Sequence, residues 1–298
     1  KGLQAAEARQ HQAQVEFAAA LAVAYASSEA GLIRRDIAAE DVDRARGDLK
    51  AAQALVDAGK EASLRVAQAQ AGLSSAEAIA ASREAEAAAA LEQLSVLAGR
   101  AEPYSGTSES LLVREWVAPA IANVDSASVL SAKADVDASD AVLRTERFKR
   151  APDLNLTAGR RNFAAGGDAL VVGVSLSIPL FDRNSGGISA ARSRSDAARA
   201  RLDAARLQSQ ADRATALARV DAAKRGLIAA SKGEEAATEA YRMARLGYEA
   251  GRTPLVELLL SRRTLTDARL SVVDARLARV AAYASLAVAS GQIAFGDM

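Results

Sequence analysis

One stretch, residues 169–187 (ALVVGVSLSIPLFDRNSGG), limits what the whole chain can fold into. The even-numbered positions from Leu170 to Leu180 are all apolar, whereas the odd-numbered positions include the small or polar Gly173 and Ser175. Successive side chains of a strand point to opposite faces, so this alternation predicts a strand with one apolar face. About ten such residues fit a tilted strand that crosses a bilayer. A half-buried strand of a soluble sheet has the same pattern, so both interpretations stay open.

The preceding segment predicts a partner strand. Residues 152–164 (PDLNLTAGRRNFA) alternate more loosely, with Leu154 and Leu156 on one face. The short run Gly166-Gly167-Asp168 lies between the two segments and is typical of a turn that joins antiparallel strands. Residues 152–181 are therefore expected to form one β-hairpin. Because an isolated two-stranded hairpin is marginal in water, it must pair with something outside itself.

The rest of the chain is expected to be helical. Aromatic residues make up only 4% of the 298 residues, alanine dominates, and residues 1–102 and 180–253 contain no proline. This composition argues against a thick globular core and favours helices packed closely side by side. The expected helices cover residues 1–56, 62–98, 126–150, 188–248 and 255–290. Ser126 and Ser128 are candidate N-caps of the third helix.

Four glycines indicate an internal repeat. Gly59 and Gly99 recur as Gly251 and Gly291 at a constant offset, and each stands where a helix is expected to end. The two halves therefore look like duplicated units, each a long helix, a tight turn and a returning helix. One hairpin precedes the second unit. By symmetry another is expected before the first, where this chain has no residues, so the chain is expected to be truncated at its N-terminus.

The last helix carries two apolar stripes in different phases, which predicts a neighbour on each side. The first stripe contains Leu258, Ser261, Leu265, Ala268, Val272 and Ala275, and the second contains Leu270, Val273, Leu277, Val280 and Ala284. Taken alone, the helices fit an antiparallel bundle or a long intracellular coiled coil. The hairpin weighs against both, because coiled coils seldom carry a β-hairpin between helices of this length.

Charge and composition exclude several classes of protein. The net charge is +1, from 38 basic and 37 acidic residues with the signs interspersed, so there is no basic tract for nucleic acid. The chain has no cysteine and therefore no disulfide or thiolate site. No run of about 18 apolar residues predicts a transmembrane helix. No nucleophile, base and orienting group converge at a recognisable spacing, so an enzyme is the least favoured class.

Two segments resemble the outer-membrane efflux protein family, the TolC-like channel subunits. These are residues 172–193 (VGVSLSIPLFDRNSGGISAARS), where the strand leads into a helix, and residues 241–291, which begin YRMARLGYEAGRTPLVELLL. The sequence PLFDRN most resembles the heavy-metal branch of the family, typified by the CzcC and CusC subunits of cation efflux systems. The resemblance covers nearly the whole chain.

The resemblance implies a mainly α fold with one β-hairpin: long antiparallel helical hairpins that form part of an α-barrel, and strands of a transmembrane β-barrel. In the family each subunit of a homotrimer supplies four strands, whereas this chain offers one pair. The implied domains are a first periplasmic helical hairpin (1–99), an equatorial segment (100–125), a helix leading to the barrel (126–151), the transmembrane hairpin (152–181), and a second periplasmic helical hairpin with the tail (182–298).

The function implied is that of the outer-membrane channel of a tripartite efflux system in a Gram-negative bacterium, a passive exit duct for heavy-metal cations. The implied partners are two further copies of the subunit, a periplasmic adaptor (membrane fusion) protein, an inner-membrane RND-type pump and outer-membrane lipid, with no nucleic acid. A multidrug or type I secretion channel is the alternative cargo class. A periplasmic coiled-coil adaptor or a soluble scaffold is the alternative from a different class, although the lipoyl-like strands of an adaptor are missing.

The tips of the helical hairpins are the candidate functional site, because in the family these turns gate the pore and dock the adaptor. The residues assigned to them are Asp57, Gly59, Glu61, Glu249, Gly251, Arg252 and Glu257. Glu257 matches an acidic position of the family, whereas Leu260 stands where a second acid is frequent. Exposed charges at helix ends are an equally good account of these residues. No catalytic residue, cofactor or metal ligand is assigned, since His11 is the only histidine.

Overall fold

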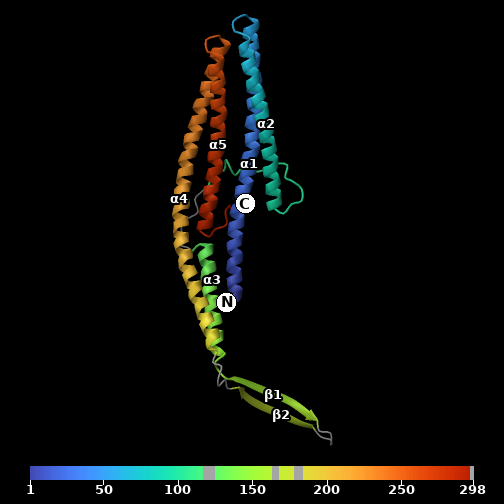
Figure 1. Cartoon of the computed structure of the whole chain (residues 1–298), viewed down its shortest axis with the longest axis vertical. Coiled ribbons are helices and arrows are strands. Elements are labelled where there is room, and N and C mark those ends of the chain that lie inside the picture. Colours follow the sequence, from blue (N-terminus) through green and yellow to red (C-terminus); the bar gives the residue numbers. More distant parts are fainter. Residues whose placement is uncertain (117–124, 163–167, 178–183, 296–298) are drawn as a thin grey trace. The chain divides into compact units, whose positions relative to one another are not determined.

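The protein is mainly helical with a single two-stranded sheet in the computed structural model, which describes residues 1–116, 125–162, 168–177 and 184–295 (Figure 1). The elements are α1 (Gly2–Asp57), α2 (Leu64–Leu97), α3 (Ala127–Phe148), β1 (Asp153–Asn162), β2 (Asp168–Ser177), α4 (Ser185–Glu249) and α5 (Leu255–Ala289). The expected order of helices and strands is confirmed. In the described part of the chain, no helix combines the length and apolarity needed to cross a membrane.

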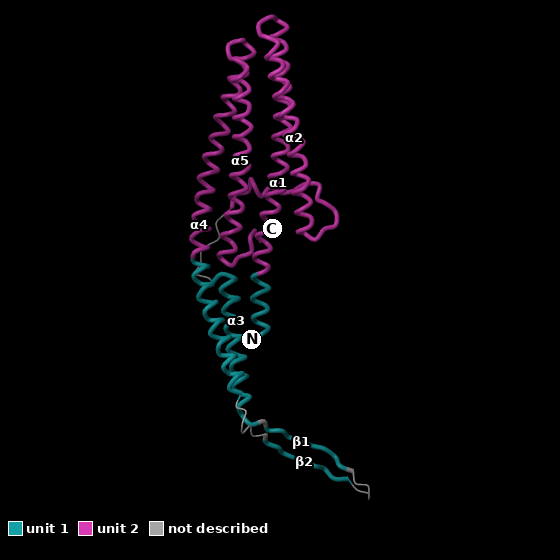
Figure 2. Tube along the Cα trace, in the orientation of Figure 1, with its two compact units in different colours: residues 1–12, 125–210 teal, residues 13–124, 211–298 magenta. Residues whose placement is uncertain are grey.

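The chain divides into two compact units (Figure 2). Unit 1 consists of residues 1–12 and 125–210 and contains α3, the sheet and the first part of α4. Unit 2 consists of residues 13–124 and 211–298 and contains α2, α5, most of α1 and the last part of α4. The candidate tips all lie in unit 2.

The four repeat glycines end four helices in the same way, as the sequence predicts. Their φ angles are +69° at Gly59, +72° at Gly99, +70° at Gly251 and +68° at Gly291. In each case the N–H of the next residue donates to the carbonyl five positions back, for example Arg252 to Gly247 over 2.8 Å. This bond is the mark of a Schellman motif, which requires the left-handed conformation that glycine adopts without strain.

The start of α4 differs from the prediction. The helix begins at Ser185 and includes Gly187, whereas a start at Ile188 was expected. Asn184 explains the difference: it adopts a φ of +52°, and its carbonyl accepts the N–H of Ile188 over 3.0 Å. Its side-chain amide also donates to the backbone carbonyl of Glu146 at the end of α3, over 3.0 Å. The helix therefore begins where Asn184 is anchored.

The hairpin is antiparallel, and its register places the apolar rows of the two strands opposite each other. Leu154 pairs with Leu176 and Leu156 pairs with Val174. The expected turn at Gly166 and Gly167 and the expected end of the second strand beyond Ser177 lie outside the described residues. Asp168 was assigned to that turn, but it is the first residue of β2, where it pairs with Asn162.

The two apolar stripes predicted for the last helix bury against different neighbours. Leu258 and Leu265 of the first stripe belong to a core shared with α1, α2 and α4. Val273 and Val280 of the second stripe contact α1 and the segment around Leu111 and Leu112. The prediction of a neighbour on each side is confirmed. Alanines on the facing helices, including the fully buried Ala26 of α1, allow this close approach.

Candidate functional site

The second tip, between α4 and α5, is firmly packed. Tyr248, Leu255 and Leu258 are all fully buried beneath it. A Cβ added to Gly247 would run into Oγ1 of Thr253, so the turn closes directly onto the helix. Pro254 stands at the N-cap position of α5 and accepts the N–H of Glu257 over 3.1 Å. The geometry of this turn is therefore set by packing as well as by its glycine.

The first tip, between α1 and α2, shares the left-handed glycine but little of that packing. Ser63 precedes α2 without making a side-chain capping hydrogen bond, and Leu64 is 61% exposed. The two turns occupy equivalent positions in the repeat, and one core contains Ala52 and Ala69 of the first helical pair as well as Tyr248, Leu255 and Leu258 of the second.

Within the described residues, the hydrogen bonds and ion pairs of Asp57, Glu61 and Glu249 are local. Asp57 accepts a hydrogen bond from Gln53 over 2.8 Å. Glu61 and Glu249 form salt bridges one helical turn away, with Arg65 at 3.3 Å and with Arg245 at 3.0 Å, respectively. The pair of Glu61 and Arg65 is half-buried and the pair of Glu249 and Arg245 is exposed, and pairs at this spacing contribute about 0.3–0.5 kcal/mol.

Arg252 and Glu257 are both exposed at the second tip. In the part of the chain that the structure describes, neither forms an ion pair with Asp57, Glu61 or Glu249. The two tips are thus not bridged by charge within one chain. Bridges between copies of the chain remain a prediction.

A buried polar cluster lies deeper in the helices, and sequence reasoning missed it. Tyr241 of α4 donates a hydrogen bond to Oδ1 of Asp48 of α1 over 3.3 Å, and Nε of Arg262 of α5 lies 3.5 Å from Oδ2 of Asp48. Thr266 donates to Oδ1 of Asp41 over 2.8 Å. A sequence signal existed: Asp41 and Asp48 stand seven residues apart on the buried face of α1, opposite a basic residue within the apolar stripe of α5.

Burial dominates the electrostatics of this cluster. Asp48 is 2% exposed and Arg262 is 8% exposed. Burial raises the pKa of Asp48 from 3.8 to about 6, although the nearby Arg262 and the hydrogen bond from Tyr241 both lower it. Burial, followed by the charge of Asp48, raises the pKa of Tyr241 to about 12.

A second polar contact, also missed, fixes the segment that follows α2. The carboxylate of Glu29 accepts from the backbone N–H groups of Leu111 and Leu112 over 2.9 and 3.2 Å, and also from the hydroxyl of Ser110. Arg279 of α5 donates to the carbonyl of Leu112 over 3.0 Å. This part of the predicted equatorial segment is thereby held against both α1 and α5. Leu111 to Val113 form a turn, and no helix is present from there to Trp116.

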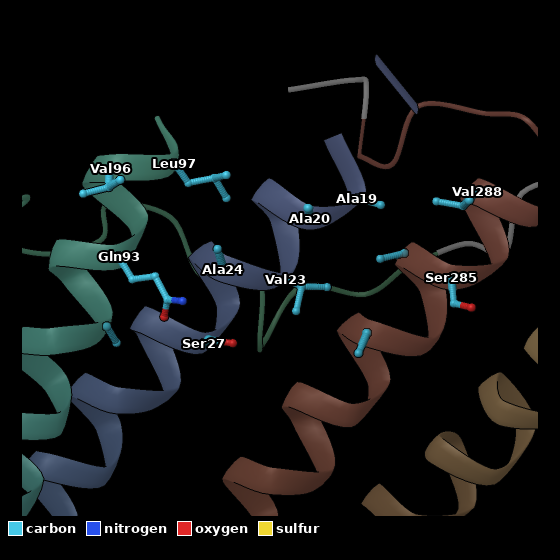
Figure 3. A pocket seen from close by; sticks show the side chains of 13 residues that line it. Ala19, Ala20, Val23, Ala24, Ser27, Gln93, Val96, Leu97, Ser285 and Val288 are labelled. Atoms are coloured by element: carbon cyan, nitrogen blue, oxygen red, sulfur yellow. The ribbon is translucent and has the colours of Figure 1, made fainter. Parts of the chain in front are cut away.

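A shallow groove of about 710 Å³ runs between α1, α2 and α5 near this segment (Figure 3). Small and apolar side chains line it, among them Ala20 and Ala24 of α1, Leu97 of α2 and Val288 of α5. Such a surface admits a closely packed helix and offers few polar groups to a small ligand. Within the described residues, no three His, Cys, Asp or Glu side chains gather in a way that could hold a metal ion.

The hairpin exposes its apolar row. Leu156 is 73% exposed, Leu170 80%, Val172 66% and Val174 65%. Thr157, Gly159, Gly173 and Ser175 occupy the other face. Within the described residues, no part of the chain covers this apolar row.

Comparisons with known proteins agree with this arrangement. The family model described as outer membrane efflux protein matches residues 119–292. The nickel and cobalt resistance protein CnrC of Cupriavidus metallidurans is 53% identical over 193 residues, which cover 64% of this chain and 46% of that protein. The nickel-cobalt-cadmium resistance protein NccC of Alcaligenes xylosoxydans is 48% identical over 303 residues, which cover all of this chain and 69% of that protein.

Among solved structures, CusC has the same fold, with a TM-score of 0.84 at 21% identity, covering 97% of this chain and 71% of that chain. The matches to CnrC and NccC cover 46% and 69% of the length of those two proteins, respectively, so this chain spans about half to two thirds of these relatives. The family model matches more than half of this chain. The chain belongs to the outer membrane efflux protein family.

Proposed function

We propose that this chain is part of the outer-membrane channel of a tripartite efflux system and forms a passive exit duct for heavy-metal cations. The observation that carries the proposal is the exposed apolar row of β1 and β2, placed between long helices that bury their own apolar stripes. The names of CnrC and NccC support divalent nickel, cobalt and cadmium as cargo. No catalytic role is part of the proposal.

The hairpin fits the dimensions of a transmembrane barrel. Each strand has 10 residues, and at about 3.3 Å per residue a strand of this length tilted by about 45° rises roughly 23 Å. This is close to the apolar band of about 25 Å in outer-membrane barrels. We infer that the row from Leu170 to Leu176 faces lipid and that Gly173 and Ser175 face the lumen.

Three copies of the chain are proposed to surround one duct. The helices would form its periplasmic wall, and the groove between α1, α2 and α5 would receive a helix of the neighbouring copy. The groove supports this through its small side chains, which suit close packing of helices. Further partners are the periplasmic adaptor and the inner-membrane RND-type pump.

The two tips are proposed as the gate and the adaptor-docking end of the duct. Arg252 and Glu257 are exposed and make no ion pair at the tips within the described chain, so both side chains are available to a neighbouring copy. Asp57, Glu61 and Glu249 would take part in the same ring. Leu260, which is 63% exposed, adds no second acid to that ring. Cations would therefore pass the tips without a strong binding ring, and the choice of cargo would lie in the pump.

Deletion of the gene tests the cargo. The deletion strain should accumulate nickel, cobalt or cadmium and lose tolerance to them, and the restored gene should reverse both effects. Tolerance to drugs, measured side by side, should not change. If only drug tolerance were lost, drugs would replace heavy-metal cations as the proposed cargo. If neither metal tolerance nor drug tolerance changed, the result would contradict a role in efflux.

Single-channel conductance tests the gate. Combined Glu257→Gln and Arg252→Gln substitutions should raise the conductance of the resting channel if these charges hold the tips together. Glu235→Gln, on an exposed position of α4, is the matched control and should leave conductance unchanged. A resting conductance equal to that of the wild type in the double variant would refute the gate assignment.

A further inference from the structure

The contact between Asp48, Tyr241 and Arg262 is the most deeply buried charged contact in the described part of unit 2. It joins α1 to α4 and α5, so it lies between the two helical pairs. The side chain of Asp48 is 3% exposed and that of Arg262 is 9% exposed. Two groups of opposite charge have thus been removed from water at the place where the pairs meet.

The geometry of the contact does not compensate for that burial. Oδ2 of Asp48 and Nε of Arg262 lie 3.5 Å apart, and neither atom makes a hydrogen bond. A buried ion pair offsets the loss of hydration only when its geometry is good and its remaining polar atoms are satisfied. Here one carboxylate oxygen is left without a donor. A neutral carboxyl group would be easier to bury at this site, because it loses less hydration than a carboxylate.

Charged and titratable groups surround Asp48 on α1, α4 and α5. They are Asp41 and Arg44 on α1, Tyr241, Arg245 and Tyr248 on α4, and Arg262 on α5. On the α2 side, Arg262 lies next to Gly72, which has no side chain. The positive groups favour the carboxylate and Asp41 opposes it, but burial outweighs all of them.

We propose that Asp48 is a proton-binding residue at the junction of the two helical pairs, and that its protonation in mildly acidic surroundings strengthens the packing of α1 against α4 and α5. The raised pKa of Asp48, about 6 against 3.8 for the ordinary side chain, agrees with this. Between these two values the folded chain binds more protons than the unfolded chain. The contribution of Asp48 to stability is therefore largest below about pH 4, falls as the pH rises towards about 6, and is constant above that.

The junction lies close to both tips along the helices. Asp48 is nine residues before the end of α1 at Asp57, about 14 Å of helix, and Arg262 is seven residues after the start of α5 at Leu255, about 11 Å. A junction tightened by acid would restrain the separation of the two helical pairs near their ends. The inference concerns packing within one chain, so it stands whether or not the tips gate a pore.

The test compares thermal unfolding of the chain between pH 4.5 and 8 for wild type, Asp48→Asn and Asp43→Asn. Asparagine resembles the neutral carboxyl group in shape, so Asp48→Asn should unfold several degrees above wild type at pH 7.5. This advantage should shrink as the pH falls towards 4.5. Asp43, whose side chain is 75% exposed on the same helix, is the matched control, and its variant should follow the wild-type profile. A difference between Asp48→Asn and wild type that does not change with pH would overturn the proposal.

A second measurement decides the matter if Asp48→Asn does not fold. The carboxyl carbon of Asp48 in the wild-type chain can be followed by NMR as the pH is changed. A titration midpoint near 6 is expected. A midpoint at or below 4 would show that the carboxyl group is ionised throughout the proposed range and would also overturn the proposal.

Discussion

The helices and the hairpin of this chain differ in where their apolar side chains lie. In α5, Leu255, Leu258 and Leu286 are completely buried by other parts of the same chain. In the hairpin, Leu156 and Leu170 are 73% and 80% exposed. These helical side chains are therefore buried by contacts that the chain itself supplies, whereas the apolar row of the hairpin has no cover among the described residues.

The largest effect is expected from a substitution inside the helical core. Leu258→Ala should reduce the free energy of unfolding by about 2–5 kcal/mol, because it removes a fully buried side chain and leaves a cavity. Leu260→Ala, on an exposed position of the same helix, should change stability by less than about 0.5 kcal/mol. Thermal unfolding of both variants measures the difference. Equal stabilities would mean that α5 is not buried by its own chain.

Charge on the apolar face of the hairpin should have the next largest effect. Val172→Lys should disfavour insertion into the outer membrane by about 2–4 kcal/mol, whereas Val171→Lys on the opposite face should be tolerated. Neither variant should change the unfolding of the helices. The fraction of protein recovered in outer-membrane preparations gives the result. Equal recovery of the two variants would contradict the assignment of Val172 to a lipid-facing side of the hairpin and Val171 to the opposite side.

The repeated turns should respond next. Gly251→Val places a β-branched side chain at a φ of +70° and should destabilise the second helical pair by about 1–2 kcal/mol. Gly226→Ala, within α4 where a Cβ meets open space, should instead stabilise the chain by about 0.5–1 kcal/mol. Chemical denaturation can resolve both. A stable Gly251→Val variant would show that the left-handed turn is not needed.

The smallest effect is expected at the start of α3, the end of this helix that lies away from the hairpin. The hydroxyl of Ser126 accepts the N–H of Val129, so Ser126→Ala should reduce stability by about 1 kcal/mol. Ser139→Ala, in the interior of α3, should have little effect. Hydrogen exchange of the first turn of α3 provides the readout. Unchanged exchange in Ser126→Ala would mean that the cap does not hold the first turn of this helix.

Local patterns were enough to predict the elements. The alternation around Val172 and Val174 identified a strand, and the spacing of Gly59, Gly99, Gly251 and Gly291 identified four helix ends, because both features depend on neighbours along the chain. The start of α4 was misplaced because Asn184 is fixed by Glu146, which belongs to another helix. A contact of this kind leaves no periodic signal.

The partners in the polar contacts between helices could not be assigned from the sequence for the same reason, although the spacing of Asp41 and Asp48 was a signal that they share a face of α1. The cluster at Asp48 combines side chains from α1, α4 and α5, and Glu29 binds the backbone of a segment about 80 residues away. An aspartate or glutamate in a helix is the same residue in the sequence whether it is buried or exposed. The packing of the helices shows which of these carboxylates are removed from water.

Lipid contact of alternate hairpin residues tests the central claim most directly. Because the chain has no cysteine, single nitroxide labels can be placed by Leu170→Cys, Val171→Cys, Val172→Cys and Val174→Cys in protein carried in outer membranes. Labels at positions 170, 172 and 174 should collide mainly with oxygen dissolved in lipid, and the label at 171 mainly with a water-soluble relaxation agent. Equal access of the aqueous agent to all four positions would contradict a membrane-crossing hairpin.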